Sequence, residues 1–335
     1  MPRSLAYLAS CLLCCCAGVV AAAELPATMQ AVSFDHFGDA AVLQYGDRPV
    51  PGIAAGDILV RVRAAAVNPA DWKSREGHYA RGALTSPIIP GFDIAGEVVA
   101  VGAQVTTFRA GQAVYAMLPL NRSGGYAQFA AVPAANAALK PRRVDDVHAA
   151  AVPLAALTAW QALEAAQLQP GQTLVVAGGA GGVGHFAVQF GKIRGARVIA
   201  TASADNQDFL RQIGADEAVD YHAVRLTERI HDADVVLDTV GGETLRASYS
   251  LVKRGGVIVS IVEDPEAAEL ARHAIRGLHA VVHTDGAQLG QIAGLIDAGK
   301  VRPSVSVILP LARAADAQSL SASGHTRGKI VLRIP

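Results

Sequence analysis

Between residues 153 and 304, short apolar runs alternate with amphipathic stretches. The runs have the length of buried strands, and the stretches repeat their apolar positions with the period of a helix. Strands are predicted at 174–177, 198–202, 219, 235–238, 257–261 and 280–283. Helices are predicted at 154–167, directly after 184, and at 206–213, 243–252 and 287–298. This alternation predicts an α/β fold with a doubly wound parallel sheet.

The pattern before residue 153 is different, because short strands punctuated by Gly and Pro replace the alternation. These strands are predicted at 30–34, 57–67, 93–101, 112–117 and 127–132. They indicate a β-rich, partly closed unit. The segments 303–309 and 329–334 are β-rich again. We therefore predict two domains, one formed by 29–152 with 305–335 returning to it, and one formed by 153–304.

A glycine-rich turn joins the predicted strand at 174–177 to the helix that follows. Its glycines fit G-x-G-x-x-G in the strand-turn-helix context that the motif requires, where the free amides of the helix start face a pyrophosphate. The predicted cofactor-binding positions are Gly179, Ala180, Gly181, Gly182, Val183 and Gly184. His185 is expected in the first turn of the helix, at the surface.

The N-terminal segment has the pattern of a secretory signal peptide. Arg3 precedes an apolar stretch at 5–20, and the alanines at 21–23 offer a cleavage site, so 1–23 is predicted to be removed. The stretch is too short to favour a spanning helix, so no membrane span is expected in the mature chain. Two alternatives remain open. Residues 8–11 resemble a lipoprotein cleavage box, and a start at Met29 would leave a cytoplasmic protein.

Composition narrows the possible partners and chemistry. Lys and Arg together number 29, as do Asp and Glu, so no nucleic-acid partner is indicated. The four cysteines, at 11, 14, 15 and 16, all lie in the predicted signal peptide. A chain that begins after residue 23 therefore has no disulfide, no cysteine nucleophile and no thiolate ligand for zinc.

Six motifs in order resemble one family. They are VNPADWK (67–73), PGFDIAGEVVAVG (90–102), ALTAWQAL (156–163), the glycine turn, LDTVGG (237–242) and RGKIVL (327–332). Together they resemble the zinc-free quinone oxidoreductases of the medium-chain dehydrogenase/reductase superfamily, the group that includes zeta-crystallin. The resemblance implies a GroES-like catalytic domain split around a Rossmann domain, with the active site in the cleft between them.

Zinc-dependent members of that superfamily carry a cysteine near the position of Pro69 and a G-H-E motif at 91–93, where this chain has Gly-Phe-Asp. The resemblance therefore implies that no zinc is bound. His279 and His283 would share one face of the strand predicted at 280–283, but two histidines without a third ligand are a weak metal site.

The resemblance also suggests the reaction and its residues. Without a metal to stabilise an alkoxide, acceptors that delocalise charge suit the cleft best, namely quinones and α,β-unsaturated carbonyls. Asn68 matches the family's asparagine near the nicotinamide, and Tyr79 matches a tyrosine at the substrate mouth, so these two are the candidate catalytic residues. Thr158 matches a threonine that approaches the nicotinamide.

Cofactor choice depends on the end of the second strand of the parallel sheet. NAD-binding proteins usually place Asp or Glu there, whereas this chain has Ser203. A hydroxyl does not repel a 2′-phosphate, and Tyr221 matches a tyrosine that borders this pocket in relatives. We therefore expect NADPH to be preferred, with NADH possible because Asp205 stands where many relatives have a basic residue.

The sequence predicts an NADPH-dependent, zinc-independent reductase of quinones or enones. The alternative is a nucleotide-binding protein that senses redox state or has a structural role without turnover. Relatives commonly pair through the edge of the Rossmann sheet, so a homodimer is expected. The signal peptide places the protein in the periplasm or outside the cell, where nicotinamide cofactor is scarce, and the start at Met29 remains the cytoplasmic alternative.

Overall fold

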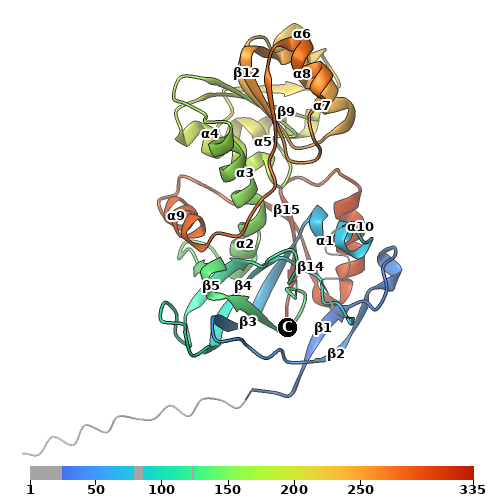
Figure 1. The fold of residues 1–335 in the computed structure, drawn as a ribbon, viewed down its shortest axis with the longest axis vertical. Coiled ribbons are helices and arrows are strands. Elements are labelled where there is room, and N and C mark those ends of the chain that lie inside the picture. Colours follow the sequence, from blue (N-terminus) through green and yellow to red (C-terminus); the bar gives the residue numbers. More distant parts are fainter. Residues whose placement is uncertain (1–24, 79–85, 123) are drawn as a thin grey trace, which may run out of the picture.

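The fold is described from a computed structural model, for residues 25–78, 86–122 and 124–335. Two parts are stacked along the long axis of the molecule (Figure 1). The predicted signal peptide and Tyr79 lie outside the described residues. None of the helices in the described ranges is long and apolar enough to cross a membrane.

The upper part in Figure 1 is a six-stranded parallel sheet with helices on both faces. Its strands are β8 (Thr173–Ala177), β9 (Arg197–Ala202), β10 (Glu217–Asp220), β11 (Ala233–Asp238), β12 (Val252–Ser260) and β13 (Arg276–His279). Its helices are α4 (Gly184–Ile193), α5 (Gln207–Gln212), α6 (Leu226–Arg229), α7 (Gly242–Ser248) and α8 (Ala267–His273). The next helix, α9 (Gly286–Asp297), packs against β7 (Ala137–Leu139) of the lower part (Figure 1). The strands lie in the order β10-β9-β8-β11-β12-β13. The chain adds strands outward from β8 to β10 and then returns to add β11 on the other side of β8. Sheets of this kind bind their ligands at this switch point, at the carboxyl ends of β8 and β11.

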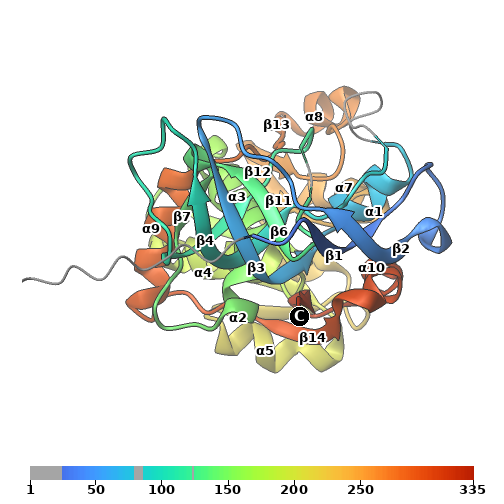
Figure 2. The same ribbon diagram turned by 90° about the horizontal axis from the view of Figure 1, so that it is seen from below.

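The lower part is a seven-stranded, mostly antiparallel sheet. It contains β3 (Asp57–Val67), β4 (Asp93–Val101), β5 (Ala113–Met117), β6 (Phe129–Pro133), β7 (Ala137–Leu139), β14 (Val305–Pro310) and β15 (Lys329–Arg333). A separate ribbon of β1 (Thr28–Ser33) and β2 (Gln44–Pro49) lies beside α10 (Ala314–Ala322) in both views (Figures 1 and 2).

A shared core joins the two parts, and a strand pairing within the lower sheet shapes the face between them. A hydrophobic core cluster runs from the antiparallel sheet through α2 (Asp146–Ala150) and α3 (Pro153–Ala165) into the parallel sheet. In addition, β15 pairs antiparallel with β3, in a register that sets Ile330 opposite Val67. This pairing brings the start of β15 next to α1 (Pro69–Arg75), the helix that follows β3. Residues far apart in the sequence therefore meet where the two parts face each other.

The strand predicted at 280–283 is wrong. The last strand of the parallel sheet is β13, at Arg276–His279, and the chain then leaves the sheet. Ala280 and Val282 pack against the core cluster and line a cleft, so their apolar character reflects packing without ladder pairing. The backbone N–H of His283 donates to Gln161, outside any strand. His279 and His283 therefore do not share a strand face, and the weak metal site at these two residues is withdrawn.

Candidate active site

The glycine turn is built from the positions that the sequence predicted. The backbone N–H of Gly179 donates to the Thr201 carbonyl at 2.8 Å, which ties the turn to β9. A Cβ atom at Gly184 would lie 2.1 Å from the Gly178 carbonyl oxygen, so only glycine lets α4 start this close to β8. An added Cβ at Gly181 would meet one atom within 4 Å, the Gly178 carbonyl oxygen at a tight 3.3 Å, so this position is less restricted than Gly184. A dinucleotide pyrophosphate fits this arrangement.

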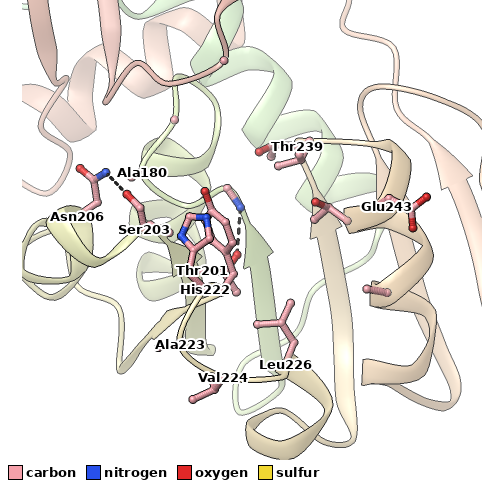
Figure 3. A pocket seen from close by; sticks show the side chains of 18 of the residues that line it. Ala180, Thr201, Ser203, Asn206, His222, Ala223, Val224, Leu226, Thr239 and Glu243 are labelled. Atoms are coloured by element: carbon pink, nitrogen blue, oxygen red, sulfur yellow. Dashed lines mark hydrogen bonds between the residues drawn. The ribbon is translucent and has the colours of Figure 1, made fainter.

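The turn opens into a cavity of about 1330 Å³ at the carboxyl ends of the parallel strands. Ser203 and Tyr221 line it, as do Gly181 and Ala180 of the turn. Figure 3 shows Ser203 beside Asn206, whose amide donates to the Ser203 hydroxyl at 3.0 Å, with Thr239 across the cavity. The cavity has the size and position for the adenosine end of a dinucleotide.

A second cleft of about 380 Å³ lies between the two parts. Its wall includes Gly181, Gly182 and Val183 of the turn, together with Asn68 and Thr158. The structure therefore brings these predicted residues to one cleft. The Thr158 hydroxyl donates to the Leu154 carbonyl at 2.7 Å within α3, so it is held in place by its own helix. The nicotinamide ring of a dinucleotide held by the turn would face Asn68.

The Asn68 side chain is buried and its orientation is fixed by two partners. Its amide nitrogen donates to Asp93 Oδ2 at 2.8 Å, and its amide oxygen accepts from Lys329 Nζ. Because a primary amide has two N–H groups, one remains for the cleft. The backbone N–H of Asn68 donates to Asp71 Oδ2 at 2.7 Å, which anchors the start of α1.

Three charged side chains meet under Asn68, all of them buried. Lys329 Nζ lies 3.7 Å from Asp93 Oδ2. Burial raises the pKa of Asp93, although the Lys329 charge opposes that shift, and burial lowers the pKa of Lys329. Burial also raises the pKa of Asp71 to about 7, against the hydrogen bonds from Asn68 and Tyr126. The asparagine is therefore set in a dry, charged surrounding in which electrostatic interactions are strong.

Asp93 and Lys329 were missed as site residues by the sequence analysis. Both lie in motifs that carry the family resemblance, at the start of β4 and of β15. A lysine that begins an otherwise apolar, buried strand is a visible signal, because Lys is almost never fully buried without a partner. The partner could not be identified, since Asn68 is 261 positions away.

His185 is in the first turn of α4 as predicted, but the expected surface position is wrong, because its side chain is completely buried. One ring nitrogen lies 2.9 Å from the Gly181 carbonyl, and the other accepts from the Ser304 N–H at 3.3 Å. Burial lowers the pKa of His185 to about 4. The neutral ring therefore fastens the glycine turn to the chain that leads into β14.

This histidine predicts a loss of stability in acid. The folded pKa lies below the ordinary value of 6.5, so the stabilisation is complete above pH 6.5 and is lost as the pH falls towards 4. A shift of this size corresponds to about 3 kcal/mol of unfolding free energy. Between pH 6.5 and pH 4, the free energy of unfolding of His185→Gln should therefore fall by correspondingly less than that of the wild type. Urea titrations at several pH values measure this difference. His36→Gln, at an exposed histidine, is the control and should follow the wild type; parallel curves for all three proteins would contradict the assignment.

The architecture and the cleft define a class. A doubly wound sheet whose glycine turn faces a β-rich domain across a cleft is typical of two-domain oxidoreductases that use a nicotinamide cofactor. Residues 54–142 match the family described as alcohol dehydrogenase GroES-like domain, and residues 213–332 match the family described as zinc-binding dehydrogenase.

Several characterised proteins are similar over almost the whole chain. The NADPH-dependent alkenal/one oxidoreductase from Arabidopsis thaliana chloroplasts is 34% identical over 94% of this chain and 82% of its own length. The 2-methylene-furan-3-one reductase from Solanum lycopersicum is 34% identical, over 92% of this chain and 80% of its own. The solved structure of the quinone oxidoreductase from Coxiella burnetii has a TM-score of 0.85 and 31% identity, covering 92% of this chain and all of that one. The chain belongs to the medium-chain dehydrogenase/reductase superfamily and is an oxidoreductase, which confirms the predicted family and fold.

The two positions at which zinc-dependent members carry ligands do not offer donors here. The side chains of Pro69 and Phe92 have no atom that coordinates a metal, and the ammonium of Lys329 lies 3.7 Å from Asp93 Oδ2. In the ranges that the structure describes, no group of three or more His, Cys, Asp or Glu side chains is placed to hold a metal ion. Among the described residues that line this cleft, the side chains do not offer the set of donors that zinc usually takes.

Proposed function

We propose that the protein is an NADPH-dependent, zinc-independent reductase of α,β-unsaturated carbonyls or quinones. The observation that carries this proposal is the cleft in which the glycine turn faces Asn68, with the buried Lys329 directly behind it. When bound, the nicotinamide supplies a hydride. The residues of this chain would orient the acceptor, exclude water and hold the negative charge that develops on its oxygen.

The remaining wall of the cleft supports a conjugated, largely apolar acceptor. It includes Leu120, Leu154, Ile261 and Val282. Such a wall favours a flat unsaturated carbonyl compound and excludes water from the reacting carbon. The similarity to an alkenal/one oxidoreductase and to a quinone oxidoreductase supports the same substrate classes.

The test of this function is direct. The chain from residue 24 onward is purified, titrated with NADPH in a calorimeter, and mixed with NADPH and a panel of enones and quinones while the cofactor's absorbance is followed. We expect binding and consumption with at least one acceptor. Binding without consumption across the panel would favour the nucleotide-binding alternative, and dependence of turnover on added zinc would overturn the metal-free reaction.

Several features of the larger cavity support a preference for NADPH over NADH. Ser203 occupies the position where an acidic residue would repel the 2′-phosphate, and Arg225 and His222 line the same cavity. Asp205, which the sequence analysis weighed against this preference, is exposed and is not part of the cavity wall. The Ser203 hydroxyl and the Arg225 guanidinium together favour a phosphorylated ribose, against the carboxylates of Glu228 and Glu243 in the same wall.

Replacing the hydroxyl with a carboxylate should reverse the preference. In Ser203→Asp, kcat/KM for NADPH is expected to fall about tenfold or more, because a carboxylate and a phosphate repel each other, while kcat/KM for NADH should stay the same or rise. Ser203→Asn, with a neutral side chain of similar size, is the control. Equal losses with both cofactors in Ser203→Asp would show that the position does not contact the ribose.

Two further proposals concern assembly and location. We propose a homodimer joined through β13, the edge strand of the parallel sheet, because an open edge offers unpaired backbone groups to a second copy. Sedimentation would measure whether the protein is a dimer.

We also propose export through a cleaved signal peptide at 1–23. The N-terminal residue of protein recovered from fractionated cells would test this export, and a start at Met29 would contradict it.

A further inference from the structure

Lys329 is the buried cation of the cleft. Its side chain is 3% exposed, and it lines the same cleft as Asn68, Thr158 and the glycine turn. Lys73 and His279 also line this cleft, but Lys73 is only half-buried, and His279 is paired with the exposed Asp264 at 3.3 Å. Among the described residues, Lys329 is therefore the cation that combines burial with a place beside the turn.

The backbone at Lys329 and the aliphatic stem of its side chain are both held against neighbouring segments. The backbone N–H of Gly328 donates to the carbonyl of Ala180 in the glycine turn, and the N–H of Lys329 donates to Ser304. A Cβ atom at Gly182 would lie 3.2 Å from Lys329 Cδ, so the aliphatic stem runs along the turn itself. A group held this firmly needs no reorganisation when charge develops beside it.

The ammonium has donor capacity to spare. It carries three N–H groups. In the described part of the chain, it donates to Asn68 Oδ1 and lies 3.7 Å from Asp93 Oδ2, which is an ion pair beyond hydrogen-bond distance. At least one N–H is therefore left for a group that enters the cleft.

We propose that Lys329 is a catalytic residue that donates a hydrogen bond from its ammonium to the carbonyl oxygen of the bound enone or quinone, an inference that rests on the proposed function. Lys329 also orients Asn68, because its donation to Asn68 Oδ1 turns the amide nitrogen towards Asp93 and the cleft. The cleft thus presents a fixed cation and an amide N–H to the same oxygen, next to positions where zinc-dependent relatives hold a metal ligand.

The reaction balances without a further reagent. The enone gains a hydride at its β-carbon, and its C=C electron pair moves to form a C=C bond to the carbonyl carbon, which leaves a negative oxygen. That enolate then takes a proton from water at its α-carbon, so the enone is reduced by two electrons while NADPH is oxidised to NADP⁺. A quinone, whose ring is a stronger acceptor, spreads the charge further and depends less on the cation. Lys329 should therefore matter more for enones than for quinones.

The charge on Lys329 should also be visible in the pH profile. The titratable groups that face it are Asp93 of β4, Asp71 of α1, Tyr126 before β6 and His185 of α4. Burial lowers the pKa of Lys329 below the usual lysine value, against the pull of the two aspartates. Since the neutral amine is a poor donor to an anion, enone reduction should fall as the pH rises through this lowered pKa. In Lys329→Met, which has no amine, this decrease of enone reduction at alkaline pH should disappear.

The central experiment compares Lys329→Met with the wild type on one enone and one quinone. We expect kcat to fall about 100-fold with the enone, the usual cost of removing one donor to a developing oxyanion, and clearly less with the quinone. The Kd for NADPH in the calorimeter should stay within about twofold, since the proposed contact is with the acceptor. Equal losses with both acceptors, or a raised Kd for NADPH, would overturn the proposal and indicate a structural or cofactor-binding role.

A second readout needs no turnover. Para-nitrophenolate resembles an enolate, and nitrobenzene is its neutral counterpart. In the chain without cofactor, Lys329→Met should weaken phenolate binding about tenfold, which is the loss of one charge-assisted hydrogen bond, and leave nitrobenzene binding unchanged. Parallel changes for the two probes would also overturn the proposal.

Two controls separate chemistry from folding. Lys329→Met leaves Asp93 buried without its cation, so Asp93→Asn with Lys329→Met removes both charges and should keep the enone-specific loss if the donor is what matters. Lys140→Met breaks a lysine–aspartate pair elsewhere, with Asp146 at 2.7 Å, and should show no difference between acceptors. If the wild type consumes NADPH with no acceptor at all, the proposed function fails; if it turns over and only the acceptor difference is missing, this inference fails alone.

Discussion

Gly184→Ala is expected to abolish nearly all cofactor binding. The added Cβ atom would lie 2.1 Å from the Gly178 carbonyl oxygen and 2.8 Å from the Gly179 Cα. These are backbone atoms, so the turn itself must shift, and with it the amides that face the pyrophosphate. A displacement of about 1 Å at such a site can cost 100-fold, and we expect at least that increase in the Kd for NADPH. Calorimetric titration measures it.

The matched control is another glycine inside a helix. Gly290 lies in α9, and an added Cβ there would meet no atom within 4 Å. Gly290→Ala should leave NADPH binding unchanged and stabilise the protein slightly, because alanine favours the helix. The overpacked Gly184→Ala should lose about 1–3 kcal/mol of unfolding free energy. Normal NADPH binding in Gly184→Ala would show that the dinucleotide does not lie on this turn.

Asn68→Ala is expected to reduce kcat with an enone by about 100-fold, the usual effect of losing one donor aimed at developing charge. The change also removes the group between Lys329 and Asp93, so one polar contact of each buried charge is lost. The free energy of unfolding should fall by about 3 kcal/mol, the order expected for losing hydrogen bonds to buried charged groups. Steady-state kinetics and urea unfolding measure the two effects.

Asn121→Ala, at an exposed asparagine, is the control for the second effect and should change neither quantity. Asn68→Asp offers a sharper comparison, because it keeps the size of the side chain and adds a third carboxylate to the cluster. It should be as inactive as Asn68→Ala and still less stable at neutral pH. Full activity in Asn68→Ala would contradict the placement of this side chain at the reaction centre.

Local patterns were enough to predict several strands and the glycine turn. The predicted bounds 57–67 and 93–101 coincide with β3 and β4, because both are β-branched and apolar-rich segments, broken only by single charged residues, that lie between turns. The glycine turn was identified from its spacing and its flanking strand and helix. These features are determined by neighbours in the sequence, which is why they can be read from it.

Features that depend on contacts between residues far apart in the sequence were not predicted correctly. The strand β2 was not predicted, because Gly46 and Pro49 interrupt it and its partner β1 supplies the pairing that holds it. The apolar residues at 280–282 were taken for a strand, although they line a cleft. His185 was placed at the surface, since nothing near it in the sequence shows that the chain at Ser304 covers it.

The candidate site likewise contains residues that local motifs identified and residues that only long-range contacts bring together. Asn68, Thr158 and the turn were matched through motifs, and the structure gathers them at one cleft. The buried charges around Asn68 could not be assembled from the sequence, because β15 and β4 reach it only through the antiparallel sheet. Tyr79 lies outside the described residues, so its role stays a prediction.

The pairing of β15 with β3 has a consequence for biosynthesis. All six strands of the parallel sheet lie between residues 173 and 279, whereas Lys329 arrives only with β15. A chain interrupted after about residue 300 would contain every strand that cradles a nucleotide, yet it would have no ammonium under Asn68 and no strand to close that edge of β3. During translation, every strand of the parallel sheet would thus be synthesised before the lysine that completes the cleft.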